Sequence, residues 1–119
     1  RSKSDEIDER VRHVSFIKAG ICWDSLSKVR NLQSLIIEEN NVTNPQLTKL
    51  LRLSPHLRVL RLASVGMKEV PTSTGKLIHL RHLDLSGNDF CVLPKSVKQL
   101  VHLQSLDLSG CFSLKQLPG

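Results

Sequence analysis

Three histidines recur at a fixed interval, and they are the first residues whose spacing could do chemistry. His56, His79 and His102 lie 23 residues apart. Imidazoles at equivalent positions of adjacent strands, about 4.8 Å apart, could ligate a metal ion. No aspartate, glutamate or cysteine shares that position, however, and a metal site needs supporting groups around its ligands. The spacing therefore predicts a partly exposed histidine ladder, with no metal and no cofactor.

Carboxylates and thiols give no stronger sign of catalysis. Asp84 and Asp107 also lie 23 residues apart, but a catalytic acid and base need different environments, whereas repetition gives these two the same one. A catalytic thiol would need a paired histidine and an electropositive pocket, which nothing in the sequence indicates for Cys22, Cys91 or Cys111. We therefore expect no enzyme.

The composition fits one domain with an aliphatic core, because 39% of the 119 residues are hydrophobic and only 3% are aromatic. The net charge is +6, and it is concentrated in residues 51–119, which hold 9 basic and 4 acidic residues. This favours an acidic partner surface; without a basic run or interleaved aromatics it does not indicate nucleic acid. No apolar run approaches the roughly 20 residues of a membrane span. The three widely spaced cysteines indicate a reducing compartment, hence a cytoplasmic protein.

A repeat organises the chain. The segments HLRVLRL (56–62), HLRHLDL (79–85) and HLQSLDL (102–108) recur every 23 residues, and NLQSLII (31–37) and RVRHVSF (10–16) extend the pattern backwards. Residues 11–119 are thus predicted to form five units, while residues 1–10, almost wholly polar, are predicted to be a flexible lead-in. The units begin near Val11, Leu32, Leu57, Leu80 and Leu103.

Each unit fits the pattern LxxLxLxxNxL, which predicts a short strand followed by a turn. The leucines of the strand point into a core shared with neighbouring units, and the residues between them point to solvent. We therefore predict an α/β solenoid of about five repeats, with a short parallel sheet on its concave face. The N positions are Ala19, Asn40, Val65, Asn88 and Cys111. Asn40, Asn88 and Cys111 are predicted to form a structural turn ladder by bonding to backbone groups freed at the turn.

The second unit is predicted to contain a true α-helix. In NPQLTKLLRL (44–53), Asn44 is the expected N-cap and Pro45 the first helical residue, and Leu47, Leu50 and Leu51 share one face.

The fifth unit has no return leg after Pro118. We expect this truncated last repeat to leave leucines exposed and to promote self-association through that end.

The stretch KLIHLRHLDLSGNDFCVLPKSVKQLVHLQSLDLSGC resembles the leucine-rich repeats of plant intracellular nucleotide-binding leucine-rich-repeat (NLR) disease-resistance proteins. ERVRHVSF resembles the start of that domain in their coiled-coil subclass, and the likeness covers roughly residues 10–119. The chain lacks the GxIP element and the cysteine-rich caps usual in extracellular plant repeats. The resemblance implies a horseshoe-shaped recognition and autoinhibition module without enzymatic activity. Its partners would be the receptor's own nucleotide-binding region, a pathogen effector or a host protein.

The outward strand positions are the candidate binding residues, because together they line the concave surface. Arg61 is expected to lie between Glu38 and Asp84 of neighbouring strands, and Arg58, Arg61 and Arg81 are expected to contact an acidic partner patch. The candidate partner-binding residues are Glu38, Arg58, Arg61, Arg81, His82, Asp84 and Asp107.

An alternative function fits the same surface, namely a generic intracellular leucine-rich-repeat scaffold. Such a module would bind a small GTPase or recognise substrates for a ubiquitin ligase. The region upstream in the parent protein would discriminate, since a phosphate-binding loop supports the receptor, and an F-box or neither element supports the scaffold. The chain itself contains no GxxxxGK[ST] motif.

Overall fold

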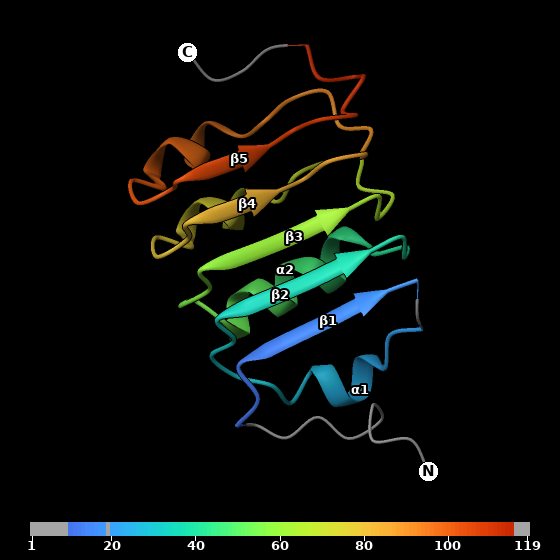
Figure 1. Ribbon diagram of the computed structural model, residues 1–119, viewed down its shortest axis with the longest axis vertical. Helices are drawn as coiled ribbons and strands as arrows, with labels where there is room; N and C mark the ends of the chain where they lie inside the picture. Colours follow the sequence, from blue (N-terminus) through green and yellow to red (C-terminus); the bar gives the residue numbers. More distant parts are fainter. Residues whose placement is uncertain (1–9, 19, 116–119) are drawn as a thin grey trace.

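The computed structural model describes residues 10–18 and 20–115. Five strands form one parallel sheet in chain order, each pairing with the next along the longest axis of the molecule (Figure 1). They are β1 (His13–Ile17), β2 (Ser34–Glu38), β3 (Val59–Ala63), β4 (His82–Asp84) and β5 (Ser105–Asp107). The predicted parallel sheet is therefore confirmed.

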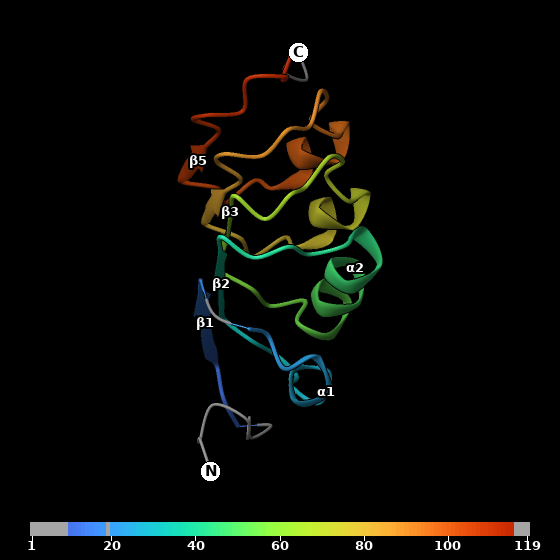
Figure 2. The same cartoon turned by 90° about the vertical axis from the view of Figure 1, so that its right-hand side faces the viewer.

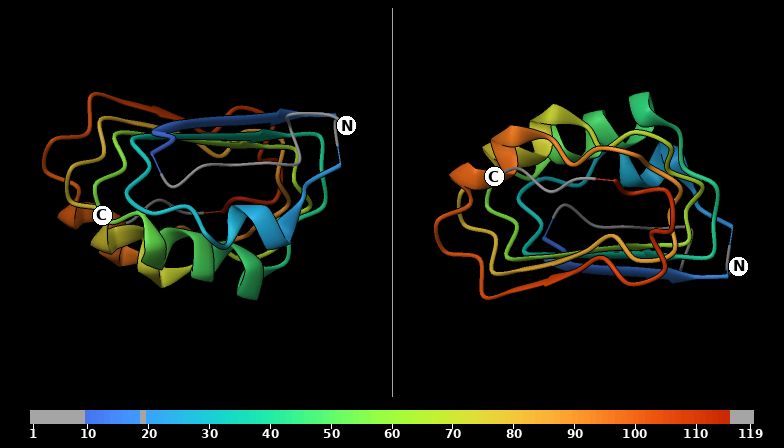
Figure 3. Two further views of the ribbon diagram at one scale, coloured as in Figure 1. Left: turned by 90° about the horizontal axis from the view of Figure 1, so that it is seen from below. Right: turned by 90° about the horizontal axis from the view of Figure 1, so that it is seen from above.

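The chain returns from each strand to the next on one side of the sheet, which gives two layers (Figures 2 and 3). The return legs contain helices α1 (Trp23–Leu26) and α2 (Asn44–Leu53) and 3-10 helices η2 (Thr72–Lys76) and η3 (Lys95–Gln99). The helices of the return legs differ in length, from the four residues of α1 to the ten of α2. The strands nevertheless stay in register, for example with Leu35 opposite Leu60 and Leu60 opposite Leu83.

The core lies between the sheet and the return legs. In β1, β2 and β3 every second residue is buried, as alternation in a strand with one covered face requires. The spacing of Leu80, Leu83 and Leu85, three and then two residues, follows from this arrangement. Leu80 enters the core before the strand, Leu83 lies in the strand, and Leu85 follows it, all buried.

The N-cap of α2 is Thr43, so the expectation that Asn44 caps this helix was wrong. The Thr43 hydroxyl accepts a hydrogen bond from the Gln46 backbone N–H, and the Gln46 side chain accepts one from the Thr43 N–H. This reciprocal capping box satisfies two backbone donors at once. Asn44 is the first helical residue, and its side-chain oxygen accepts a hydrogen bond from the Thr48 hydroxyl.

A left-handed residue follows every strand at the same place. It stands two positions after the last inward residue, at Lys18, Glu39, Ser64, Gly87 and Gly110, with φ between 53° and 72°. Glycine adopts this conformation without the steric cost that other residues bear. Two of the five turns are therefore unstrained, and three are formed by residues with a side chain.

The last described strand is less covered than the others. Leu106 of β5 is 40% exposed, whereas Leu83 at the equivalent position of β4 is 1% exposed. Leucine exposure at this end was expected, while self-association through it stays a prediction. Residues 1–9 of the predicted lead-in (1–10), the predicted turn position Ala19 and residues 116–119 lie outside the described part of the chain.

Candidate functional site

The outward face of the sheet, called here the sheet face, collects side chains from all five strands. Strand register aligns these residues in rows that cross the sheet. The first row is His13, Ser34, Val59, His82 and Ser105, and the central row is Ser15, Ile36, Arg61, Asp84 and Asp107. Because alternate residues build the core, these rows are available for contact with another molecule.

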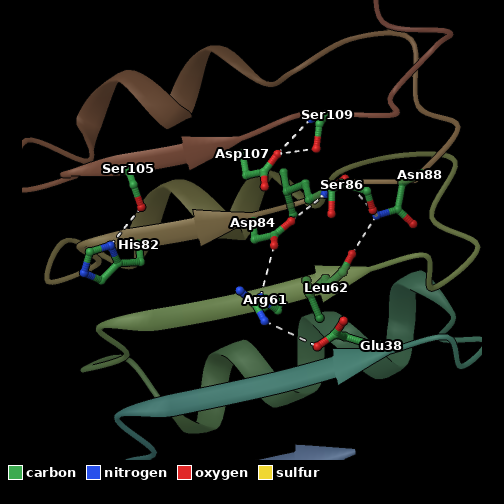
Figure 4. A network of polar contacts seen from close by, with 11 residues as sticks. Glu38, Arg61, Leu62, His82, Asp84, Ser86, Asn88, Ser105, Asp107 and Ser109 are labelled. Atoms are coloured by element: carbon green, nitrogen blue, oxygen red, sulfur yellow. Dashed lines mark hydrogen bonds and ion pairs between the residues drawn. The ribbon is translucent and has the colours of Figure 1, made fainter. Parts of the chain in front are cut away.

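Arg61 lies between carboxylates of both neighbouring strands (Figure 4). Its Nε is 3.1 Å from Asp84 Oδ2, and its Nη1 is 3.5 Å from Glu38 Oε2. Such partly exposed ion pairs are worth about 0–1 kcal/mol each. Their main effect is to offset the charge of Arg61 within the protein and to orient its guanidinium.

The two aspartates of the central row also order the turns that follow their strands. Asp84 Oδ1 accepts a hydrogen bond from the Ser86 N–H at 2.8 Å. Asp107 Oδ1 accepts hydrogen bonds from the Ser109 hydroxyl at 2.6 Å and the Ser109 N–H at 2.9 Å. The Ser109 hydroxyl, then its N–H, and also the positive charge of Arg61 hold the pKa of Asp107 below its ordinary value, against an opposing effect of desolvation. Both aspartates are therefore fixed in position, Asp107 with an exposed side chain and Asp84 with a half-buried one.

The three arginines predicted to act together are divided. Arg58 and Arg81 stand just before β3 and β4, about 10 Å along the strand direction from the row of Arg61. The Arg81 N–H donates to the Arg58 carbonyl at 2.8 Å, which keeps these two residues next to each other. Both are exposed. Within the described residues, neither guanidinium forms an ion pair or a hydrogen bond.

His82 contacts the neighbouring strand. Its Nδ1 is 2.8 Å from Ser105 Oγ across the β4–β5 pair (Figure 4). A shallow depression of the sheet face contains both residues and Val59, together with the central-row residues Arg61, Asp84 and Asp107. Val59 and Ser105 were absent from the candidate set. The repeat frame alone places both residues in the same row as His82, so the sequence was sufficient to identify them as candidates.

The histidine ladder lies beside this region. The rings of His56 and His79 stack, with centroids 5.3 Å apart and an interplanar angle of 29°. Across residues 10–18 and 20–115, no group of three or more His, Cys, Asp or Glu side chains is placed to hold a metal ion.

A strand together with the return leg that follows it is called here a coil. The turn ladder residues bond to the preceding coil and do not reach the sheet face. Asn88, which is 2% exposed, accepts hydrogen bonds from the Val65 and Met67 N–H groups and donates to the Leu62 carbonyl at 2.6 Å (Figure 4). Asn40 donates to the Phe16 carbonyl, and the Cys111 thiol donates to the Leu85 carbonyl. These side chains hold adjacent coils together.

The chain matches a known family. A family model described as a leucine-rich repeat region matches residues 10–119, which include all five strands. No curated protein matches the chain. In the described part of the chain, no helix combines the length and apolar character needed to cross a membrane.

Proposed function

This chain belongs to the leucine-rich-repeat family, and on that basis we propose that it is a protein-recognition module that binds its partner on the sheet face. One observation carries the proposal. The inward residues of the strands build the core, and the outward residues form continuous rows of varied polar and charged side chains. Such a surface suits specific contact with another protein, because charge complementarity selects partners more than it adds affinity.

We further propose that the repeats form a solenoid with horseshoe curvature. Each coil contacts mainly its neighbours, as repeat proteins do. The helices of the return side are bulkier than the strands, which favours a curved stack with the sheet face on its concave side. A partner would then be held within the curve of the sheet.

The biological setting that we propose is a plant intracellular immune receptor of the coiled-coil NLR subclass. The LDLSGN and LPxxVxxL elements support it through their resemblance to that family. The module would act in the cytoplasm without enzymatic activity, holding the receptor's own nucleotide-binding region inactive and sensing an effector or a guarded host protein. The free thiols of Cys22, Cys91 and Cys111 agree with a reducing compartment.

Site-specific photocrosslinking tests the proposed recognition face. A photoreactive amino acid replaces Ser105 on the sheet face or, as a control, Thr72 on the return side; both positions are exposed. We expect crosslinks to a protein partner from position 105 and few from position 72. Equal crosslinking from both positions, or none from position 105, contradicts the proposal.

The identity of the crosslinked protein tests the setting. The parent's nucleotide-binding region, an effector or a host defence protein supports the receptor, as does a phosphate-binding loop encoded upstream of the repeats. A small GTPase or a ubiquitin-ligase subunit instead supports the scaffold and contradicts the immune-receptor assignment.

A further inference from the structure

Histidines and carboxylates are distributed unevenly along the strand direction, while Lys18 and Lys68 lie among the carboxylates that follow the strands. The strands begin at one edge of the sheet, the leading edge, and end at the other, the trailing edge (Figure 1). Among the described residues, all histidines lie at the leading edge, at or just before strand starts: His13, His56, His79, His82 and His102. Six of the seven described acidic residues lie at strand ends or in the segments that follow them: Glu38, Glu39, Glu69, Asp84, Asp89 and Asp107. The exception is Asp24, in α1.

Arg58 and Arg81 are the permanent cations at the centre of the leading edge. They lie side by side just before β3 and β4, where the chains are spaced about 4.8 Å apart, and like charges so placed repel each other. No carboxylate in the described part of the chain pairs with either one. Arg61, three residues further along, has two carboxylate partners. The charge of Arg61 is thus offset within the protein. The charges of Arg58 and Arg81 are not offset by the described carboxylates, and an external partner can contact them.

We propose that Arg58 and Arg81 bind an acidic, extended segment of a partner protein that crosses the strands at the leading edge. This rests on the proposed function, because it names the chemistry of the partner on that same sheet. Each guanidinium can donate two parallel hydrogen bonds to one carboxylate. The flanking imidazoles of His56 and His79 add polar groups, and the excess of carboxylates at the trailing edge, which Lys18 and Arg61 offset only in part, disfavours an acidic segment there.

A protein segment suits this edge better than a nucleic acid does. Proteins that bind single strands combine a basic groove with aromatic side chains on which bases stack. Among the described aromatic side chains, Phe16 and Phe90 are buried, Trp23 lies in α1, and Phe112 follows β5.

The proposal is tested with a fluorescein-labelled decaglutamate peptide and fluorescence anisotropy at low ionic strength. We expect the full chain to bind it and the Arg58→Glu/Arg81→Glu double variant to lose affinity at least about tenfold, a loss typical of removing charge-assisted contacts. The Arg58→Gln/Arg81→Gln variant should also lose affinity, but less. The matched control is Lys68→Glu/Lys95→Glu, which changes the net charge equally at exposed positions away from the leading edge. It should change the affinity less than about threefold, since contacts outside the site contribute little. Circular dichroism verifies that each variant is folded.

Three results would overturn the proposal. They are no binding of decaglutamate by the full chain, an equal loss in both charge-reversed doubles, and tighter binding of deca-thymidylate that depends on Arg58 and Arg81. The last result would assign the edge to a nucleic acid. Photocrosslinking from position 105 is independent of these outcomes, so failure of the acidic-segment proposal can be distinguished from failure of sheet-face recognition.

Discussion

Replacing Asn88 with alanine should destabilise the protein strongly, because this one side chain satisfies backbone groups of two coils. Its Oδ1 is the acceptor for the N–H groups of Val65, at 3.0 Å, and Met67, at 3.1 Å. Its Nδ2 donates to the carbonyls of Leu62, at 2.6 Å, and Leu85, at 2.9 Å. Asn88 is 2% exposed, so water cannot replace these bonds without a local opening of the turn.

The magnitude follows from the groups left without partners. Each buried polar group that loses its hydrogen bond costs about 1–3 kcal/mol. The Leu85 carbonyl keeps the Cys111 thiol as a donor, so the alanine variant orphans two donors, the Val65 and Met67 N–H groups, and one acceptor, the Leu62 carbonyl. With some relaxation, these three groups give an expected loss of about 3–5 kcal/mol in the free energy of unfolding. Domains of this size are stable by about 5–15 kcal/mol, so the loss is a large fraction of the total.

Equilibrium unfolding in urea measures this loss, and Asn40→Ala is the matched control. Asn40 occupies the same turn position but is only partly buried, and it donates just two bonds, to Phe16 and Glu38. We expect Asn40→Ala to cost about 1 kcal/mol, with an unchanged dependence of the free energy on urea in both variants. The reasoning is refuted if Asn88→Ala costs no more than Asn40→Ala.

Three further predictions concern single contacts. Thr43→Ala should lower the stability by about 1 kcal/mol because it removes the capping box of α2, whereas Asn44→Ala should cost clearly less. Thermal unfolding compares the two variants, and a larger loss of stability in Asn44→Ala would identify Asn44 as the cap. Ser109→Ala should raise the pKa of Asp107, because the serine hydroxyl is the largest cause of its lowering, and NMR titration of the side-chain carboxyl reports it; an unchanged pKa contradicts this. Since the folded-state pKa is the lower one, the stabilisation from Asp107 is present above the ordinary aspartate value and is lost as the pH falls through the folded-state pKa; the alanine variant should lose less stability over that acidic range. Gly87→Ala should cost about 1–2 kcal/mol in denaturant unfolding, because φ is +69° and the new Cβ would meet the Ser64 hydroxyl; a neutral effect would show that the turn adapts.

The repeat made the sheet predictable from the sequence. Once the 23-residue frame is placed, it determines which residues point inward and which strands are neighbours, and so places Arg61 between Glu38 and Asp84. The separation of Arg58 from Arg61 was also implicit in the frame, because three residues of strand span about 10 Å.

Local side-chain choices were harder to predict. Thr43 and Asn44 are both good capping residues, and the reciprocal bond with Gln46 decides between them. The pairing of His82 with Ser105 depends on the rotamer of each side chain, which a sequence pattern does not specify. The second acceptor role of Asn88, toward Met67, depends on the path of the loop after β3.

The unequal return legs have a consequence for how such a protein can evolve. The predicted units begin 21, 25, 23 and 23 residues apart, yet the strands keep one register because the return side absorbs the differences. Insertions and deletions on that side therefore leave the alignment of the outward rows of the sheet face intact. Unequal crossing-over between gene copies could exchange whole coils and create new combinations of outward residues while the core stays the same.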